Sequence, residues 1–270
     1  YRQDQLPSTH PIAADMYDLE AVEVNFDGIT YAKGASSLRQ LVAWVGEKEF
    51  LTGLKAYFDK HAWGNTRLSD LLVELERSSG RDLSTWAHAW LETSGVNLLR
   101  PHVEVGPDGA YTSVAVEQEP PSSPPGVPAI LRPHRIAIGL YDRTATGLER
   151  TRRIEVDVVG ARTEIPELVG VQQPAVLLLN DDDLTFCKIR LDEVSLRSAV
   201  ESLASLDSAL ARALIWAAAW DMLRDAELPM GDFLTLVESG LPSETDISVV
   251  TVFSGEAALS TWRRRSRSRR

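Results

Sequence analysis

The chain has 270 residues, of which 44% are hydrophobic and 25% are charged, and its formal net charge is −11. This composition is that of an ordinary globular protein, and its acidic balance argues against nucleic acid as a partner. No apolar run approaches the roughly 20 residues that cross a bilayer, which argues against a membrane protein.

The start of the chain and its cysteine content bear on where the protein works. The sequence opens on Tyr1 in polar sequence typical of mid-chain, without Met or a signal peptide, so we expect a missing upstream segment. Cys187 is the only cysteine, and a single thiol forms no internal disulfide, which predicts a cytoplasmic protein. Because Cys187 lies in an apolar run, we expect it to be a buried core residue.

Residues 1–95 are predicted to be helical after an irregular start. Apolar residues recur at helical spacing in 38–45, and the pattern repeats in 50–58, 68–75 and 86–90. Short loops separate these stretches. We therefore expect four helices that bury one shared apolar seam.

Residues 96–189 change to the alternating pattern of half-buried strands. The alternating or apolar stretches contain Val103, Val114, Ile136, Ile154, Val176 and Phe186. The proline-rich stretch 120–133 is expected to be a surface loop, because proline cannot join the interior of a strand ladder. About seven short strands at this spacing predict a β-sandwich.

Residues 190–270 return to helical periodicity. Apolar residues recur in 194–206, 210–216 and 233–237, with prolines marking the turns. Two or three helices are too few to be stable alone, so we expect the truncated start of a helical array. The basic stretch 262–270, WRRRSRSRR, could bind nucleic acid, but we expect it to be an unusual chain end without a binding role.

Motifs that would carry chemistry are few. The five histidines are too far apart for an H-E-x-x-H zinc helix, and neither a cysteine pair nor an acidic cluster supplies a substitute zinc site. The run Asp181-Asp182-Asp183 lacks the spaced ligands of a calcium loop, so we expect a solvated turn there.

One block of sequence carries a specific resemblance. Residues 25–36, NFDGITYAKGAS, resemble the block that follows the zinc-binding helices in the aminopeptidase N family of zinc metallopeptidases. Further stretches that match in order and spacing are 8–12, 57–66, 83–86, 90–91, 215–222 and 240–246. The resemblance covers nearly the whole chain to about residue 255.

The resemblance implies a multidomain α+β protein. Residues 1–95 would be the helical C-terminal part of a thermolysin-like catalytic domain, residues 96–189 a β-sandwich, and residues 190–270 the truncated start of an α-helical superhelix. It also implies a zinc cofactor, whose ligands are absent from this chain and are expected in the upstream segment. The changes of periodicity divide the chain at the same places.

The resemblance implies one catalytic residue in this chain, Tyr31. In the family, this tyrosine donates its phenolic hydroxyl to the oxyanion that forms when zinc-activated water attacks the scissile carbonyl. A phenol with a pKa near 10 stays protonated at neutral pH, and one such donor can lower the barrier by on the order of 3 kcal/mol. We expect Gly34 to let the following helix approach its neighbour closely and so keep the ring in place. Without the resemblance, Tyr31 would be interpreted as a core or turn aromatic.

Other residues of the resembling blocks are expected to be structural. Lys33 is predicted to be a solvated or salt-bridged surface lysine, with nothing nearby to lower its pKa. His10 and His61 are predicted to make structural hydrogen bonds. The tryptophans at helical spacing, predicted to pack in the core, are Trp86, Trp90, Trp216 and Trp220.

The resemblance therefore implies part of a zinc-dependent aminopeptidase, of the alanyl or lysyl type, that releases N-terminal amino acids from peptides. This chain alone is expected to bind no catalytic zinc and to cut no peptide. The alternative is a non-catalytic binding or scaffolding module from a partial or degraded gene. The substrate side-chain preference and the oligomeric state stay open.

Overall fold

The computed structural model describes residues 1–252, and the basic stretch 262–270 lies outside the described residues. The first helices are α1 Leu19–Val24, α2 Gly34–Val45, α3 Glu47–His61, α4 Leu68–Ser79 and α5 Ser84–Leu91. The strands are β1 Leu98–Val105, β2 Tyr111–Glu119, β3 His134–Arg143, β4 Leu148–Val158, β5 Arg162–Glu164, β6 Val176–Asp181 and β7 Lys188–Ile189. The last helices are α6 Glu193–Ser202, α7 Ala209–Arg224 and α8 Met230–Gly240. Short 3₁₀ helices are Gln3–Gln5, Pro166–Leu168, Leu203–Ser205 and Leu241–Ser243.

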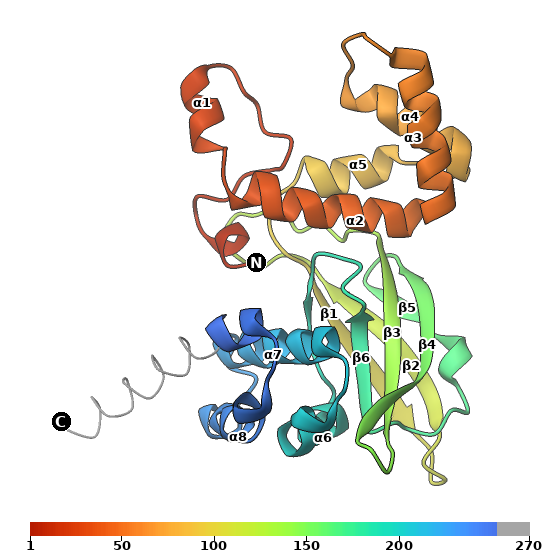
Figure 1. The fold of residues 1–270 in the computed structure, drawn as a ribbon, viewed down its shortest axis with the longest axis vertical. Coiled ribbons are helices and arrows are strands. Elements are labelled where there is room, and N and C mark those ends of the chain that lie inside the picture. The colour runs from red at the N-terminus through yellow and green to blue at the C-terminus, as the bar shows by residue number, and fades with distance from the viewer. Residues whose placement is uncertain (253–270) are drawn as a thin grey trace, which may run out of the picture.

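Helices α1 to α5 lie together at one end of the molecule, above the sheets in Figure 1. The four helices predicted for this region are confirmed as α2, α3, α4 and α5. Helices α2, α4 and α5 bury an apolar cluster that includes Leu41, Leu75 and Trp90. Glycines with positive φ, Gly46 and Gly80, end α2 and α4, a backbone conformation that glycine adopts without a Cβ clash.

Helix α3 departs from the expected shared seam. Its only buried residue is Gly53, and a Cβ there would lie 2.9 Å from the carbonyl oxygen of Glu74 on α4. Because α3 packs on α4 through this glycine, Leu51 and Phe58 point away and stay exposed. The prediction that all four helices bury their apolar residues in one seam is therefore wrong for most of α3.

Two sheets follow the helices in the chain. One has the strand order β5-β2-β1-β7 and the other has the order β4-β3-β6, with β1 and β7 parallel and the other neighbours antiparallel. Residues of both sheets, such as Val116 and Ile138, share one buried core with Trp216 of α7. The molecule thus mixes helices and sheets as an α+β protein does, while the division into three domains stays a prediction.

Side chains of helices α2 and α5 form hydrogen bonds to the backbone at the start of β3. The Gln40 amide donates to the carbonyl of Arg135 at 3.3 Å and accepts its N–H at 3.1 Å. Trp90 Nε1 donates to the carbonyl of Pro133 at 2.9 Å. These bonds satisfy backbone groups at the start of β3 and join the helical end to the sheets.

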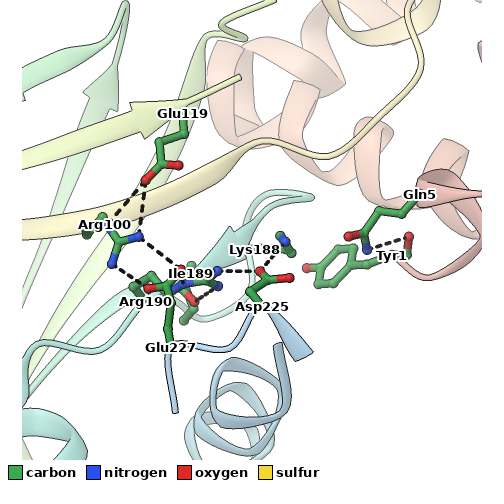
Figure 2. Close-up of polar contacts among 9 residues, drawn as sticks. All are labelled: Tyr1, Gln5, Arg100, Glu119, Lys188, Ile189, Arg190, Asp225 and Glu227. Atoms are coloured by element: carbon green, nitrogen blue, oxygen red, sulfur yellow. Dashed lines mark hydrogen bonds and ion pairs between the residues drawn. The ribbon is translucent and has the colours of Figure 1, made fainter. Parts of the chain in front are cut away.

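An ion-pair network fastens the turn after α7 to the sheet that contains β1 and β7 (Figure 2). Arg190 is buried and contacts Asp225 at 2.5 Å and Glu227 at 2.9 Å. Arg100 contacts the other oxygen of Glu227 at 2.9 Å, and Lys188 contacts Asp225 at 2.6 Å. Although partial burial opposes it, hydrogen bonds from both arginines lower the pKa of Glu227 to about 2.

The loop 120–133 differs from the surface loop that was predicted. It joins β2 to β3 without a strand, as its prolines require, but Arg132 within it is fully buried. The guanidinium donates to the carbonyl of Ala89 at 2.9 Å, to Asn97 Oδ1 at 2.6 Å and to Thr93 Oγ1 at 2.7 Å. Because these oxygens replace water around the charge, part of this loop belongs to the interior.

The acidic run Asp181-Asp182-Asp183 is not the solvated turn that was predicted. Asp181 is buried and accepts hydrogen bonds from Tyr141 at 2.9 Å and Arg150 at 2.8 Å. Asp182 pairs with Arg150 and with Arg153. The carboxylates of Asp181 and Asp182 are neutralised by arginines of β4, a pairing that the acidic run in the sequence does not reveal.

The remaining core predictions can be compared with the structure directly. Cys187 is buried, as predicted, and so are Trp86, Trp90 and Trp216, whereas Trp220 is partly buried. Among the described residues, helices of the length and apolarity that would cross a membrane do not occur.

Candidate active-site residues

Tyr31 lies on a π-helix, Ile29–Lys33, which comes between α1 and α2 in the chain. The Gly34 amide donates to the carbonyl five residues earlier, which gives this turn one residue more than an α-helical turn. Such turns often mark functional sites. The Tyr31 side chain is 57% exposed and its ring stands edge-on to Phe26, with 5.0 Å between the centroids. Its hydroxyl is therefore presented at the surface of the described chain.

Asp27 fixes the first half of this turn. Its Oδ1 accepts the amides of Ile29 at 2.8 Å and Thr30 at 3.2 Å, as an N-terminal cap does. Its Oδ2 accepts Gln3 Nε2 at 2.5 Å and lies 3.1 Å from His10 Nε2. Partial burial opposes ionisation, but the bonds from Thr30, His10 and Ile29 outweigh it and lower the pKa of Asp27.

Lys33, at the other end of the turn, is not the surface lysine that was predicted. Its side chain is 1% exposed, and its Nζ lies 2.9 Å from Asp4 Oδ2 and donates to the carbonyl of Thr93 at 3.2 Å. Burial lowers the pKa of Lys33 to about 8, with Asp4 opposing and Arg132 adding to the shift. The salt bridge was expected; the depth of burial and the lowered pKa were not, because the partners lie 29 and 60 residues away.

The two histidines of the resembling blocks differ from each other. His10 makes the structural contacts predicted for it, through Nδ1 to the carbonyl of Pro11 at 2.8 Å and through Nε2 to Asp27. For His61, the prediction of a structural hydrogen bond is wrong for Nε2, which is buried without a partner among the described residues. The His61 ring instead packs beside Tyr57 at 5.5 Å.

Gly34 does not have the role expected of it. A Cβ at this position would approach no atom of another residue closer than 3.9 Å, from Ile12, and the backbone φ is −57°. A Cβ would therefore fit without a close contact. The turn that carries Tyr31 is held by Asp27 and Lys33 rather than by a close helix contact at Gly34.

A run of exposed apolar side chains precedes Tyr31 in the chain. We call them the α1 surface: Met16, Tyr17, Leu19, Val22, Val24 and Phe26. All but the first two and the last belong to α1, a helix whose six residues are all unburied. Apolar side chains gathered in this way are typical of a surface that another polypeptide covers.

Residues 1–252 contain no group of three or more His, Cys, Asp or Glu side chains that could hold a metal ion. The nearest approach to one beside Tyr31 is the pair His10 and Asp27, and both are engaged in the contacts of the turn. Two occupied groups do not fit the four-coordinate zinc sites of proteins. The described residues therefore do not fit the zinc that the resemblance implies.

Two family models match the chain. The Peptidase family M1 domain matches residues 1–90, which include Tyr31 and both of its anchors, and the ERAP1-like C-terminal domain matches residues 176–266. The aminopeptidase N of Streptomyces lividans is 61% identical over 253 residues, which is 93% of this chain and 30% of that protein. The chain belongs to the aminopeptidase N family. The similarity supports a peptidase function by family.

Other relatives match shorter parts of the chain. Tricorn protease-interacting factor F2 of Thermoplasma volcanium is 37% identical over 43% of this chain and 14% of its own length. Aminopeptidase 2 of Candida albicans is 36% identical over 36% of this chain and 10% of its own length. The chain thus spans less than a third of the relatives it matches.

The structure adds Asp4, Asp27 and Lys33 to the residues around Tyr31. Asp27 and Lys33 lie in the block that resembles the aminopeptidase N family, and this position in the sequence is the one signal that could have linked them to Tyr31. Nothing in the sequence paired Lys33 with Asp4, because helical and strand periodicities report neighbours within one element only.

Proposed function

We propose that this chain forms part of a zinc-dependent aminopeptidase that releases N-terminal amino acids from peptides. Tyr31 donates its hydroxyl to the oxyanion of the tetrahedral intermediate. The observation that carries the proposal is the geometry of Tyr31: a phenol half exposed to solvent on a turn whose two ends are both anchored.

An oxyanion donor needs the properties that this geometry supplies. The hydroxyl must point out of the fold toward the substrate, and its backbone must be fixed before the reaction so that no reorganisation is needed. The exposed Tyr31 ring, supported on its side by Phe26, meets the first need. The bonds of Asp27 to the amides of Ile29 and Thr30 meet the second.

Residues 1–252 contain no group of side chains that fits zinc. When bound, zinc would supply the activated water. Its ligands would come from another polypeptide segment, and the α1 surface beside Tyr31 is where we propose that this segment packs. A cytoplasmic location and the absence of nucleic-acid binding stay predictions from composition.

A hybrid enzyme tests the proposal. We would replace the matched 253 residues of the Streptomyces lividans aminopeptidase N with this chain and measure zinc-dependent hydrolysis of alanyl and lysyl chromogenic amides. We expect activity, and a decrease in kcat of about 10²- to 10³-fold on Tyr31→Phe, the effect typical of one oxyanion donor.

Tyr57→Phe is the matched control, because Tyr57 on α3 lies outside the α1 surface and its hydroxyl contacts only Thr66, at 2.6 Å, so that it has no proposed role. We expect its kcat to change by less than about two-fold. A folded hybrid without activity, judged by its circular dichroism and Tm, would favour the non-catalytic module. An active hybrid that Tyr31→Phe leaves unchanged would exclude Tyr31 as the donor.

A further inference from the structure

Lys33 and Tyr31 are two residues apart on one π-helix and face different surroundings. Tyr31 points to the surface, whereas Lys33 enters the interior with its Nζ 5.8 Å from the centroid of the Phe186 ring. The side chain of Lys33 therefore anchors the same turn that presents Tyr31. A displacement of Lys33 would be transmitted to Tyr31 through two peptide units.

Asp4, the partner of Lys33, is itself fixed on several sides. Its Oδ1 accepts Thr9 Oγ1 at 2.6 Å and the Gly95 amide at 3.0 Å, and its Oδ2 faces Lys33 Nζ at 2.9 Å. Through Asp4, the turn is connected to Thr9, which follows the 3₁₀ helix Gln3–Gln5, and to Gly95, which lies between α5 and β1. Lys33 also donates to the carbonyl of Thr93, two residues before Gly95.

Gln3 and Asp4, two adjacent residues near the N-terminus, contact the two ends of the turn. Gln3 donates to Asp27 at the beginning of the π-helix, and Asp4 pairs with Lys33 at its end. Two adjacent residues thus hold the two ends of a five-residue turn. This arrangement fixes the orientation of the turn as well as its position.

A buried ion pair is a poor source of stability, because both charges lose their water and the pairing only offsets that loss. Its better-supported use is to specify one arrangement among several. Lys33 and Asp4 are both almost completely buried, in contrast to the surface pair of Lys55 and Asp59 on α3. The chain therefore retains a costly interaction directly beside its candidate catalytic residue.

We propose that Lys33 and Asp4 are positioning residues, whose ion pair holds the π-helix so that the Tyr31 hydroxyl points to the reacting carbonyl. This inference rests on the proposed function for its kinetic consequence, but the restraint on the turn does not. The pair acts through Tyr31 and touches neither substrate nor metal.

Hydrogen exchange in the 270-residue chain tests the restraint without any activity. We expect Lys33→Met to accelerate amide exchange at residues 29–34 about ten-fold or more, while exchange in α6 and in the sheets stays unchanged. Asp4→Asn should do the same, and the double variant should be no faster than either single variant, because the two groups form one interaction. Additive effects of the two substitutions, or unchanged exchange at 29–34, would overturn the inference.

Lys188→Met is the matched control, since Lys188 is a buried lysine paired with an aspartate, Asp225, in another part of the fold (Figure 2). We expect it to leave exchange at residues 29–34 unchanged. If it accelerates exchange there as much as Lys33→Met does, the effect is a general loss of stability and the inference is wrong.

The hybrid enzyme tests the kinetic consequence. A misplaced donor weakens the binding of the transition state more than the binding of the substrate. We therefore expect Lys33→Met to lower kcat about 10- to 100-fold and to keep KM within about two-fold of the wild-type value. Loss of kcat on Tyr31→Phe but not on Lys33→Met would overturn the positioning role and leave the proposed function standing. An inactive hybrid whose residues 29–34 still respond to Lys33→Met would overturn the function and support the restraint.

Discussion

The two ends of this molecule bury their apolar residues to different extents. Of the 22 large apolar residues that are exposed in the described chain, 15 lie in residues 1–91 and 7 in residues 92–252. The sheets and α6 to α8 close one core of their own, whereas the helical end leaves the α1 surface and much of α3 in water. The candidate catalytic residue lies in the open region.

The two regions also use buried charge differently. In the helical end, burial outweighs the attraction of Asp4 and lowers the pKa of Lys33 to about 8. In the C-terminal region, burial opposes but the bonds from Arg212 and nearby amides prevail, which lowers the pKa of Glu244 to about 2. Ionisation of Lys33 thus costs stability, and ionisation of Glu244 contributes stability.

The largest expected difference between the two regions is the loss of stability when an apolar side chain is shortened, and one substitution in each region tests it. Leu178 on β6 is fully buried and Leu19 on α1 is 86% exposed. We expect Leu178→Ala to lower the free energy of unfolding by about 3 kcal/mol or more and Leu19→Ala to change it by less than about 0.5 kcal/mol. Urea denaturation of the chain measures both; equal losses would mean that the α1 surface is not open.

Acid unfolding tests the charge of Glu244. Its pKa is 4.5 when unfolded and about 2 when folded, so its contribution is fully present above pH 4.5 and is lost as the pH falls through about 2. The contribution is on the order of 3 kcal/mol at neutral pH. We expect the stability difference between the wild type and Glu244→Gln to shrink as the pH falls from 4.5 to 2. A difference that is constant over this range would contradict the assignment.

Alkaline titration should show the opposite sign for Lys33. Its pKa falls from 10.5 when unfolded to about 8 when folded, so the unfolded state binds more protons between these values and stability rises with pH there. Relative to Lys33→Met, the wild type should gain unfolding free energy between pH 8 and 10.5. Asp4 and Arg132 are the charged groups that face Lys33, and Asp4→Asn should extend this window to lower pH, because Asp4 raises the folded pKa of Lys33 while the unfolded value stays the same.

A smaller effect is expected from the network in Figure 2, which joins the sheet to the C-terminal helices. Arg190 is buried and Arg100 is about one-third exposed, although both contact Glu227. We expect Arg190→Met to lower the unfolding free energy by about 2 kcal/mol, since it leaves two carboxylates short of a partner, and Arg100→Met to lower it by less than about 1 kcal/mol. Equal losses of unfolding free energy from the two variants would show that burial does not determine how much each arginine contributes to stability.

The elements of the fold could be predicted from the sequence because their signals are local. Helical spacing around Leu41 and alternation around Val114 and Ile136 identified helices and strands at the right places. The sequence does not predict β5 or the π-helix. A strand of three residues is too short for an alternating pattern, and the one additional residue in the π-helical turn leaves no periodic signal.

The surroundings of Tyr31 could be predicted only in part, because its anchors come from distant segments. Tyr31 was identified by resemblance, and its role stays a proposal. The burial of Lys33 depends on Asp4, which lies 29 residues earlier, and the exposed face of α3 depends on how Gly53 packs on α4. The expectation for Gly34 is wrong because a glycine within a motif does not by itself indicate close packing, and a Cβ at this position would make only ordinary contacts.

The central claim is that Tyr31 stabilises the transition state, and a paired measurement in the hybrid enzyme tests it most directly. We would compare kcat/KM with the Kd of a phosphinic peptide analogue of the tetrahedral intermediate, in the wild type and in Tyr31→Phe. A donor used only in the transition state predicts that both weaken by the same factor, about 10²- to 10³-fold. A loss of kcat/KM with unchanged affinity for the analogue, or no loss at all, would contradict the assignment of Tyr31.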